Sequence, residues 1–416
     1  MRSPSRAFLG AGGTVRCGRW TSGVSRRAKR IGPVVGSTLL VLVLLPVFAA
    51  GAANAPSAPG GPAFYNAPAK LISGKPGTVI WSRRVHTPAE MSAAASTTLV
   101  LYRSVLPNGN PTAVSGLVFI PRGKPPKGGW RLISWAHGTT GIADQCAPSR
   151  NAASSYIYPD LNGWLKRGYA IAQTDYQGLG TPGVHLYLIG RAEGASVVDI
   201  ALAARRLDPR IGVRFAIAGH SQGGQAALFA AAEARADAPA LKLVGVAAFA
   251  PASHITPQVQ AAGSLTAPGG ALSALGGLIL TSAAAASPAV HLSALLTPAA
   301  LALVPEVQRE CLTQLAEPSS WGGLAPAQIE RPGADPTALY HVLDAMNPAL
   351  KIVAPVLILQ GEADTTVFPA FTGMLDQELI AKGDHVELRT FPDVTHATVV
   401  TVGYGAATAW LAKRFR

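Results

Sequence analysis

The sequence predicts an α/β protein with a mostly parallel sheet, helices on both of its faces and an inserted helical cap. Apolar segments typical of strands alternate with segments typical of helices along most of the chain. Polar and glycine-rich motifs follow several of these strands directly, and this edge of an open α/β sheet is where ligands bind. Residues 254–348 break the alternation, because they are rich in Ala, Leu, Ser and Gly and contain no clear strand.

The chain has 416 residues, which is enough for one large core and an insertion. We divide it into an export signal over 1–55, the first part of the core over 56–253, the cap over 254–348 and the second part of the core over 349–416. Within the cap, the apolar segment 272–280 is interrupted by two glycines, which suits a movable lid. A static helical layer is the alternative.

Runs rich in β-branched and aromatic residues predict the strands, and runs rich in Ala, Leu, Glu and Arg predict the helices. In chain order, strands are expected over 98–104, 114–120, 130–136, 168–174, 213–218, 242–249, 355–360 and 386–391, and helices over 190–207, 225–236, 371–382 and 397–415. The first two strands flank a Pro107-Asn108-Gly109-Asn110 turn, so they should form a hairpin. Residues 56–68 are rich in Pro, Ala and Gly, which predicts an extended lead-in.

The N-terminal segment has the three parts of an export signal. A basic stretch ends at Arg30, an apolar core spans about 39–50, and Ala53-Asn54-Ala55 fits a cleavage site. We therefore expect a secreted protein, whereas an uncleaved segment would associate the chain with the cell envelope. Cys146 and Cys311 remain after cleavage, an even number in an oxidising compartment, so we expect them to pair. Two buried free thiols are the alternative.

The net charge of +13 would suit a nucleic-acid-binding protein, but the distribution of the charge does not. The first 55 residues hold eight Lys and Arg and no acidic residue, and without those eight the net charge falls to +5. Neither a basic run with interleaved aromatic residues nor a metal-binding, P-loop or dinucleotide-binding motif occurs. We therefore expect no nucleic-acid partner, no metal, no cofactor, and a monomer.

The most informative motif is Gly219-His220-Ser221-Gln222-Gly223, which reads G-x-S-x-G between an expected strand and an expected helix. In that context the serine lies on a tight turn above the sheet, at the N-terminus of the helix. The hydroxyl of Ser221 would then act as a nucleophile, and the N–H of Gln222 would face a developing oxyanion. The alternative is an ordinary strand-to-helix turn.

A serine alcohol needs a base to take its proton, and the base needs an acid to orient it. The order expected after such a turn is Ser, acid, His. His396 follows the last expected strand and is our candidate base for Ser221. Asp364 follows the strand before it and is our candidate acid, with Glu362 as the alternative. His220, inside the motif, is expected to pack or bond locally.

A second oxyanion donor should come from the loop after an early strand, where His137-Gly138-Thr139-Thr140 stands. We choose the N–H of Thr139, with those of Gly138 and Thr140 as alternatives. Gly138 allows a close backbone approach, and His137 is expected to orient the loop rather than to transfer protons.

With these residues assembled, the chain resembles the secretory lipase family, the fungal lipase A type and its actinobacterial relatives. The specific motifs are Trp135-Ala136-His137-Gly138-Thr139, Asp144-Gln145-Cys146-Ala147-Pro148-Ser149, Thr174-Asp175-Tyr176-Gln177-Gly178-Leu179-Gly180, the G-x-S-x-G motif, Gly361-Glu362-Ala363-Asp364 and Thr395-His396. The resemblance implies an α/β-hydrolase fold with a helical cap and activity on carboxylic esters of lipids. It places the nucleophile on Ser221, the acid on Asp364 and the base on His396. It also implies a disulfide similar to a Cys146–Cys311 pair.

The leading hypothesis is a secreted lipase or esterase that forms an acyl-enzyme on Ser221. Its partner would be a lipid or small ester, with transient contact to a lipid surface. An acyltransferase with the same three residues is the first alternative, and a non-catalytic cell-envelope binding protein is the second. One departure from the family is His220, where the fungal type carries a bulky aromatic residue. The cap is also rich in Ala and Gly, so the fungal chain-length preference is not carried over.

Overall fold

The computed structural model describes residues 57–151 and 155–416. The predicted export signal over 1–55 lies outside these residues. Within the described part of the chain, no helix is both long and apolar enough to cross a lipid bilayer.

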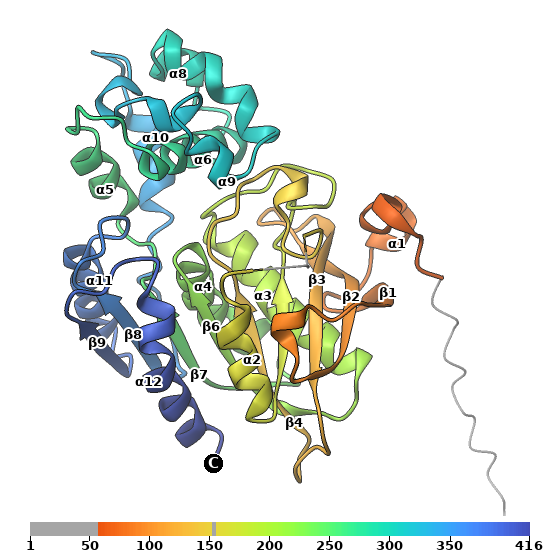
Figure 1. Cartoon of the computed structure of the whole chain (residues 1–416). Coiled ribbons are helices and arrows are strands. Elements are labelled where there is room, and N and C mark those ends of the chain that lie inside the picture. Colours follow the sequence, from red (N-terminus) through yellow and green to blue (C-terminus); the bar gives the residue numbers. More distant parts are fainter. Residues whose placement is uncertain (1–56, 152–154) are drawn as a thin grey trace, which may run out of the picture. The chain divides into compact units, whose positions relative to one another are not determined.

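In the described residues, nine strands form a single sheet in the order β1-β2-β3-β5-β4-β6-β7-β8-β9. They are β1 Val79–Val85, β2 Ala94–Val105, β3 Pro111–Pro121, β4 Trp130–Ala136, β5 Tyr169–Thr174, β6 Ile211–His220, β7 Lys242–Phe249, β8 Val356–Gly361 and β9 Val386–Phe391. Strands β1, β2, β3 and β5 pair antiparallel, and every pairing from β5 through β9 is parallel (Figure 1). The predicted mostly parallel sheet and its N-terminal hairpin are therefore confirmed. The sequence interpretation missed β1.

Helices cover both faces of the sheet. On one face α3 (Gly190–Leu207), α4 (Gln222–Asp237) and α11 (Pro369–Ala381) pack into one hydrophobic cluster with the strands. On the other face α2 (Tyr158–Lys166) and α12 (Val399–Arg414) pack into a second cluster. Neighbouring strand residues alternate between the two clusters, as a sheet buried on both sides requires.

The N-terminal lead-in was predicted to be extended, and this is wrong for part of it. Gly61–Tyr65 forms a short 3-10 helix that buries Phe64 completely. The carbonyl of Phe64 accepts a hydrogen bond of 2.8 Å from the indole N–H of Trp81 in β1. Burial of one large aromatic ring outweighs the local preference of Pro and Gly for open backbone.

Between β7 and β8 the described chain is helical, with only isolated β-bridges. The helices are α5 Ile255–Ala262, α6 Ala271–Ala286, α7 Leu292–Leu295, α8 Pro298–Leu303, α9 Leu312–Leu315 and α10 Thr337–Asp344. They share a hydrophobic cluster of their own and gather beyond the edge of the sheet where strands such as β6 end (Figure 1). We keep the name cap segment for residues 254–348.

The two glycines of the cap segment do not interrupt its longest helix, because α6 runs through Gly276 and Gly277. A Cβ at Gly277 would lie 2.7 Å from the ring of Trp321, which is fully buried. This glycine is therefore explained by close packing. The predicted Cys146–Cys311 disulfide is present and links the loop after β4 to the cap segment.

Candidate active site

Ser221 lies on a tight turn between the end of β6 and the first residue of α4. Its backbone has φ 60° and ψ −120°, an unfavourable conformation for a residue with a side chain, which typically costs about 1–3 kcal/mol. The turn is held by a 2.9 Å hydrogen bond from the N–H of Ser221 to the carbonyl of Phe249. A Cβ at Gly219 would lie 2.1 Å from the carbonyl oxygen of Gly223, and one at Gly223 would lie 2.0 Å from that of Ala136. Only glycine fits at these two positions.

We expect Gly223→Ala to disrupt this turn. The new methyl group would overlap backbone atoms that cannot rotate away, so the variant should lose more than about 3 kcal/mol of stability or most of its activity. Gly405→Ala in α12 is the matched control, because a Cβ there meets no atom within 4 Å. Urea unfolding and ester hydrolysis would check both variants. Equal behaviour of the two variants would contradict this geometry.

The structure brings Ser221, His396 and Asp364 into one hydrogen-bonded row. The Nε2 atom of His396 lies 2.9 Å from Oγ of Ser221, and Nδ1 lies 2.7 Å from Oδ2 of Asp364. Because a carboxylate only accepts, Nδ1 carries the proton and Nε2 is free to accept one from the serine. The loops after β8 and β9 supply the acid and the histidine, at the same edge of the sheet as the turn.

Asp364 is 2% exposed and held by several donors. Its Oδ1 accepts hydrogen bonds from the N–H groups of Thr366 and Val367, at 2.8 and 2.9 Å. Burial acts to raise the pKa of Asp364, but the bond from His396 and these N–H groups outweigh it and hold the pKa below its usual value. Asp364 is therefore ionised at neutral pH. The alternative acid, Glu362, is exposed.

His220 was expected to pack or bond locally, and the structure shows which groups it bonds. Its Nε2 lies 3.0 Å from the backbone carbonyl of His396, so Nε2–H donates there. Its Nδ1 then accepts from the hydroxyl of Tyr156 at 2.8 Å. Burial and the neighbouring His396 lower the pKa of His220 to about 3, which keeps the ring neutral. His220 thus ties the loop of His396 to the turn that holds the serine, and only tertiary contacts reveal this.

The two expected oxyanion donors lie on adjacent segments. Gln222 is the first residue of α4, so its N–H has no partner within the helix. The loop that carries Thr139 lies against the same turn, because a Cβ at Gly138 would come within 3.1 Å of Nδ1 of His220. The hydroxyl of Thr139 is hydrogen-bonded to that of Tyr187 at 2.8 Å.

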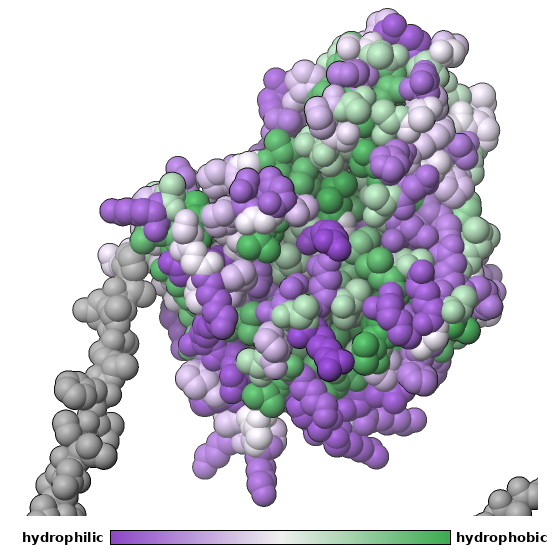
Figure 2. All heavy atoms as spheres, turned by 180° about the vertical axis from the view of Figure 1, so that it is seen from behind, coloured by the Kyte–Doolittle hydropathy of each residue, from purple (hydrophilic) through white to green (hydrophobic). Residues whose placement is uncertain are grey.

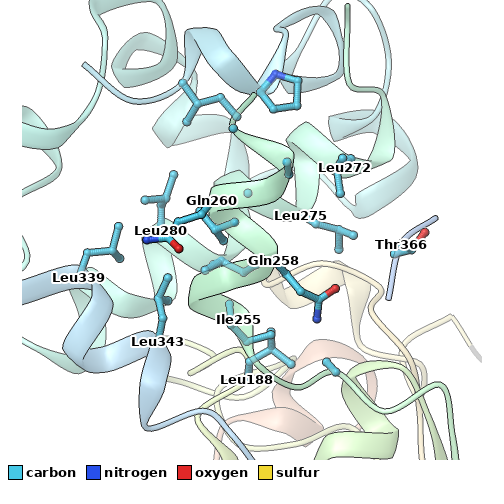
Figure 3. A pocket seen from close by; sticks show the side chains of 18 of the residues that line it. Leu188, Ile255, Gln258, Gln260, Leu272, Leu275, Leu280, Leu339, Leu343 and Thr366 are labelled. Atoms are coloured by element: carbon cyan, nitrogen blue, oxygen red, sulfur yellow. The ribbon is translucent and has the colours of Figure 1, made fainter. Parts of the chain in front are cut away.

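A largely apolar cavity of about 340 Å³ opens from Ser221 into the cap segment. Figure 3 shows Leu272, Leu275 and Leu280 of α6 and Leu339 and Leu343 of α10 converging on it. Figure 2 shows the molecule from behind, with hydrophobic residues gathered at the lower end of its upper part. In Figure 1 this upper part holds the helices of the cap segment. No group of three or more His, Cys, Asp or Glu in the described part of the chain could hold a metal ion.

Comparisons with known proteins agree with the fold. Residues 156–315 match the family described as Secretory lipase, and residues 318–415 match the Prolyl oligopeptidase family. Lipase A of Moesziomyces aphidis is 26% identical over 200 residues, which are 44% of this chain and 41% of that protein. The chain therefore spans less than half the length of this relative.

Solved structures show the same architecture. Lipase A of Candida antarctica has a TM-score of 0.73 at 19% identity, with 86% of this chain and 87% of that chain covered. The rice cell wall degrading esterase LipA of Xanthomonas oryzae has a TM-score of 0.67 at 19% identity, with 80% and 96% covered. Together these matches show that the chain has the α/β-hydrolase fold, and residues 156–315 are similar to the secretory lipases.

Proposed function

We propose that this protein is a secreted serine hydrolase that cleaves carboxylic esters of lipids through an acyl-enzyme on Ser221. The observation that carries this proposal is the hydrogen-bonded row of Ser221, His396 and Asp364 at the mouth of an apolar cavity. The similarity to lipases and an esterase supports the reaction class.

In this mechanism Nε2 of His396 takes the hydroxyl proton of Ser221 while Oγ bonds to the ester carbonyl carbon. The carbonyl oxygen becomes an oxyanion that accepts hydrogen bonds from the N–H groups of Gln222 and Thr139. His396 then gives its proton to the departing alcohol, and the C–O bond breaks to leave the acyl-enzyme. Water then attacks the acyl carbonyl carbon while His396 takes its proton. His396 returns that proton to Oγ of Ser221 as the acyl–oxygen bond breaks and the acid leaves. Asp364 stays ionised and stabilises the imidazolium.

The substrate class follows from the cavity, because the lining is mostly leucine, isoleucine, valine and alanine and includes Ser221. Burial of a methylene group is worth about 0.8 kcal/mol, so such a lining favours esters with long aliphatic chains. Secretion fits both the N-terminal signal in the sequence and the family that matches.

Hydrolysis of p-nitrophenyl esters from acetate to palmitate tests the proposal. We expect hydrolysis that improves from short to medium or long chains and releases free acid. Product analysis with glycerol present separates the alternatives: mainly acylglycerol at low glycerol would indicate an acyltransferase. No turnover of any ester would contradict the proposal.

Gly276 offers a direct test of the cavity. It lines the cavity, and a Cβ there would meet only Cδ1 of Ile329, at an ordinary 3.5 Å. Gly276→Leu should keep the fold, since leucine is a better helix former than glycine. Its side chain should displace about two methylene groups of the substrate from the cavity. At about 0.8 kcal/mol each, kcat/KM for long-chain esters should fall about tenfold, with that for acetate within about twofold.

The matched control for this change is Gly373→Leu in α11. Gly373 does not line the cavity, and a Cβ there meets no atom within 4 Å. This variant should keep the wild-type chain-length profile. Equal loss of long-chain and short-chain hydrolysis in Gly276→Leu would contradict the assignment of the cavity.

A further inference from the structure

A buried carboxyl group beside the nucleophile turn takes no part in the proposed mechanism. Glu193 of α3 is 0% exposed. Its Oε1 accepts a 2.7 Å hydrogen bond from the side-chain amide of Gln222 and a 2.9 Å bond from the N–H of Leu188. Its Oε2 has no hydrogen-bond partner among the described residues. The side chain of Gln222, the residue that follows the nucleophile, is thus hydrogen-bonded to a buried acid.

His185 completes the anchorage of Gln222. Its Nδ1 lies 2.9 Å from the carbonyl of Gln177, so Nδ1–H donates and Nε2 accepts. Nε2 lies 3.0 Å from the amide nitrogen of Gln222, which therefore donates one hydrogen to His185 and the other to Glu193. Burial lowers the pKa of His185 to about 3, so its 3.6 Å approach to Glu193 is not an ion pair.

The same acid also supports the second expected donor. Glu193 holds the N–H of Leu188, a residue with an unusual φ of 60°. The preceding residue, Tyr187, is hydrogen-bonded through its hydroxyl to the side chain of Thr139. Oε1 of Glu193 therefore contacts Gln222 directly, and it is linked to Thr139 through the turn at Tyr187 and Leu188.

We propose that Glu193 is a positioning residue that holds both oxyanion donors, Gln222 directly and Thr139 through the turn at Tyr187 and Leu188. This inference depends on the proposed function. Glu193 touches neither Ser221 nor the reacting atoms in this scheme, and it acts by fixing the position of two N–H groups. Preorganised donors of this kind contribute strongly, since loss of one typically costs about 10²–10³ in turnover.

The protonation state of Glu193 gives the inference a distinctive pH dependence. Burial raises the pKa of Glu193 to about 8, although the bonds from Gln222 and Leu188 oppose this, so the group is neutral at pH 7. The titratable groups that face it are His185, Tyr187 and Tyr176. His185 is neutral, and burial raises the pKa of both tyrosines.

Above about pH 8, Glu193 would therefore ionise, and no cation among the residues that the structure describes acts on its charge. The new negative charge would lie beside Gln222 and oppose an oxyanion at its N–H. Turnover of the wild type should fall as pH rises through this range. Glu193→Gln keeps a carbonyl oxygen that can accept from the side-chain amide of Gln222 and the N–H of Leu188. It cannot ionise, so the turnover of this variant should not fall above about pH 8.

The test is steady-state hydrolysis of p-nitrophenyl butyrate by the full chain. Glu193→Leu should lower kcat by about 10–10² with KM nearly unchanged, and Glu193→Gln should stay within about threefold of wild type at pH 7. Asp199→Asn is the matched control, since Asp199 is also buried on α3 but its carboxylate accepts from Ser104 on β2. It should keep wild-type kcat.

The pH profiles keep the inference testable if Glu193→Leu does not fold. A fall in wild-type kcat between pH 7.5 and about pH 9 that is absent in Glu193→Gln supports it. The inference is wrong if both enzymes share one alkaline limb, or if a folded Glu193→Leu keeps wild-type kcat. In either case the proposed function would stand as long as the wild type hydrolyses esters through Ser221.

Discussion

Replacement of Ser221 with alanine is expected to reduce ester turnover by about 10⁶, with little change in stability. The alcohol oxygen is the only atom removed, and in the proposed mechanism it forms the covalent bond to the substrate. Its partner, Nε2 of His396, lies 2.9 Å away and would have no proton to accept from the variant. Residual catalysis would come from the oxyanion donors and from substrate binding alone.

Ser253→Ala serves as the control for this change. Ser253 is another buried serine, located just after β7 at the same edge of the sheet, and its hydroxyl has no hydrogen-bond partner among the described residues. Initial rates on p-nitrophenyl butyrate and thermal unfolding of both variants would be measured. Near wild-type rates in Ser221→Ala, or equal losses in the two variants, would show that another group performs the chemistry.

Removal of the disulfide should cause a large loss of stability. Cys146 and Cys311 close a loop of 165 residues, and loss of a native disulfide commonly costs about 2–5 kcal/mol. The Cys146→Ser/Cys311→Ser double variant should therefore unfold at markedly lower urea concentration. Thiol reduction of the wild type should reproduce the loss and leave the double variant unaffected. Unfolding free energies of the oxidised wild type and the double variant that agree within about 0.5 kcal/mol would contradict this expectation.

The disulfide also joins the cap segment to the loop of an expected oxyanion donor. Next to the bridge, the N–H of Leu312 donates to the carbonyl of Thr140 at 2.9 Å, and Gly141 pairs with Cys311. Thr140 directly follows Thr139. The double variant should accordingly lose turnover as well as stability, since this loop would be less firmly held.

The sequence was sufficient to predict the architecture of the site, for a physical reason. Parallel strands point their carboxyl ends to one edge, so motifs that follow such strands must converge there. Ser221, Asp364 and His396 each follow a strand of the parallel part of the sheet, and the structure joins them in one row. Their catalytic roles remain the proposal that the experiments above test.

The parts that sequence reasoning missed depend on tertiary contacts. His220 bonds to Tyr156 and to the carbonyl of His396, and Glu193 bonds to Gln222; these partners are far away in the chain, and nothing in the local pattern identifies them. Gly277 has the sequence pattern of a helix break, yet it allows Trp321 to pack closely. Residues 61–65 have an open-chain composition, but burial of Phe64 orders them. In each case, burial and packing outweigh local propensity.

The most direct test of the central claim is to locate the nucleophile chemically. The wild-type protein would be treated with a fluorophosphonate carrying an alkyl chain, digested and analysed by mass spectrometry. The proposed mechanism predicts one stoichiometric adduct on Ser221, formed more slowly in His396→Ala and absent in Ser221→Ala. An adduct on any other residue, or none with the folded wild type, would contradict it.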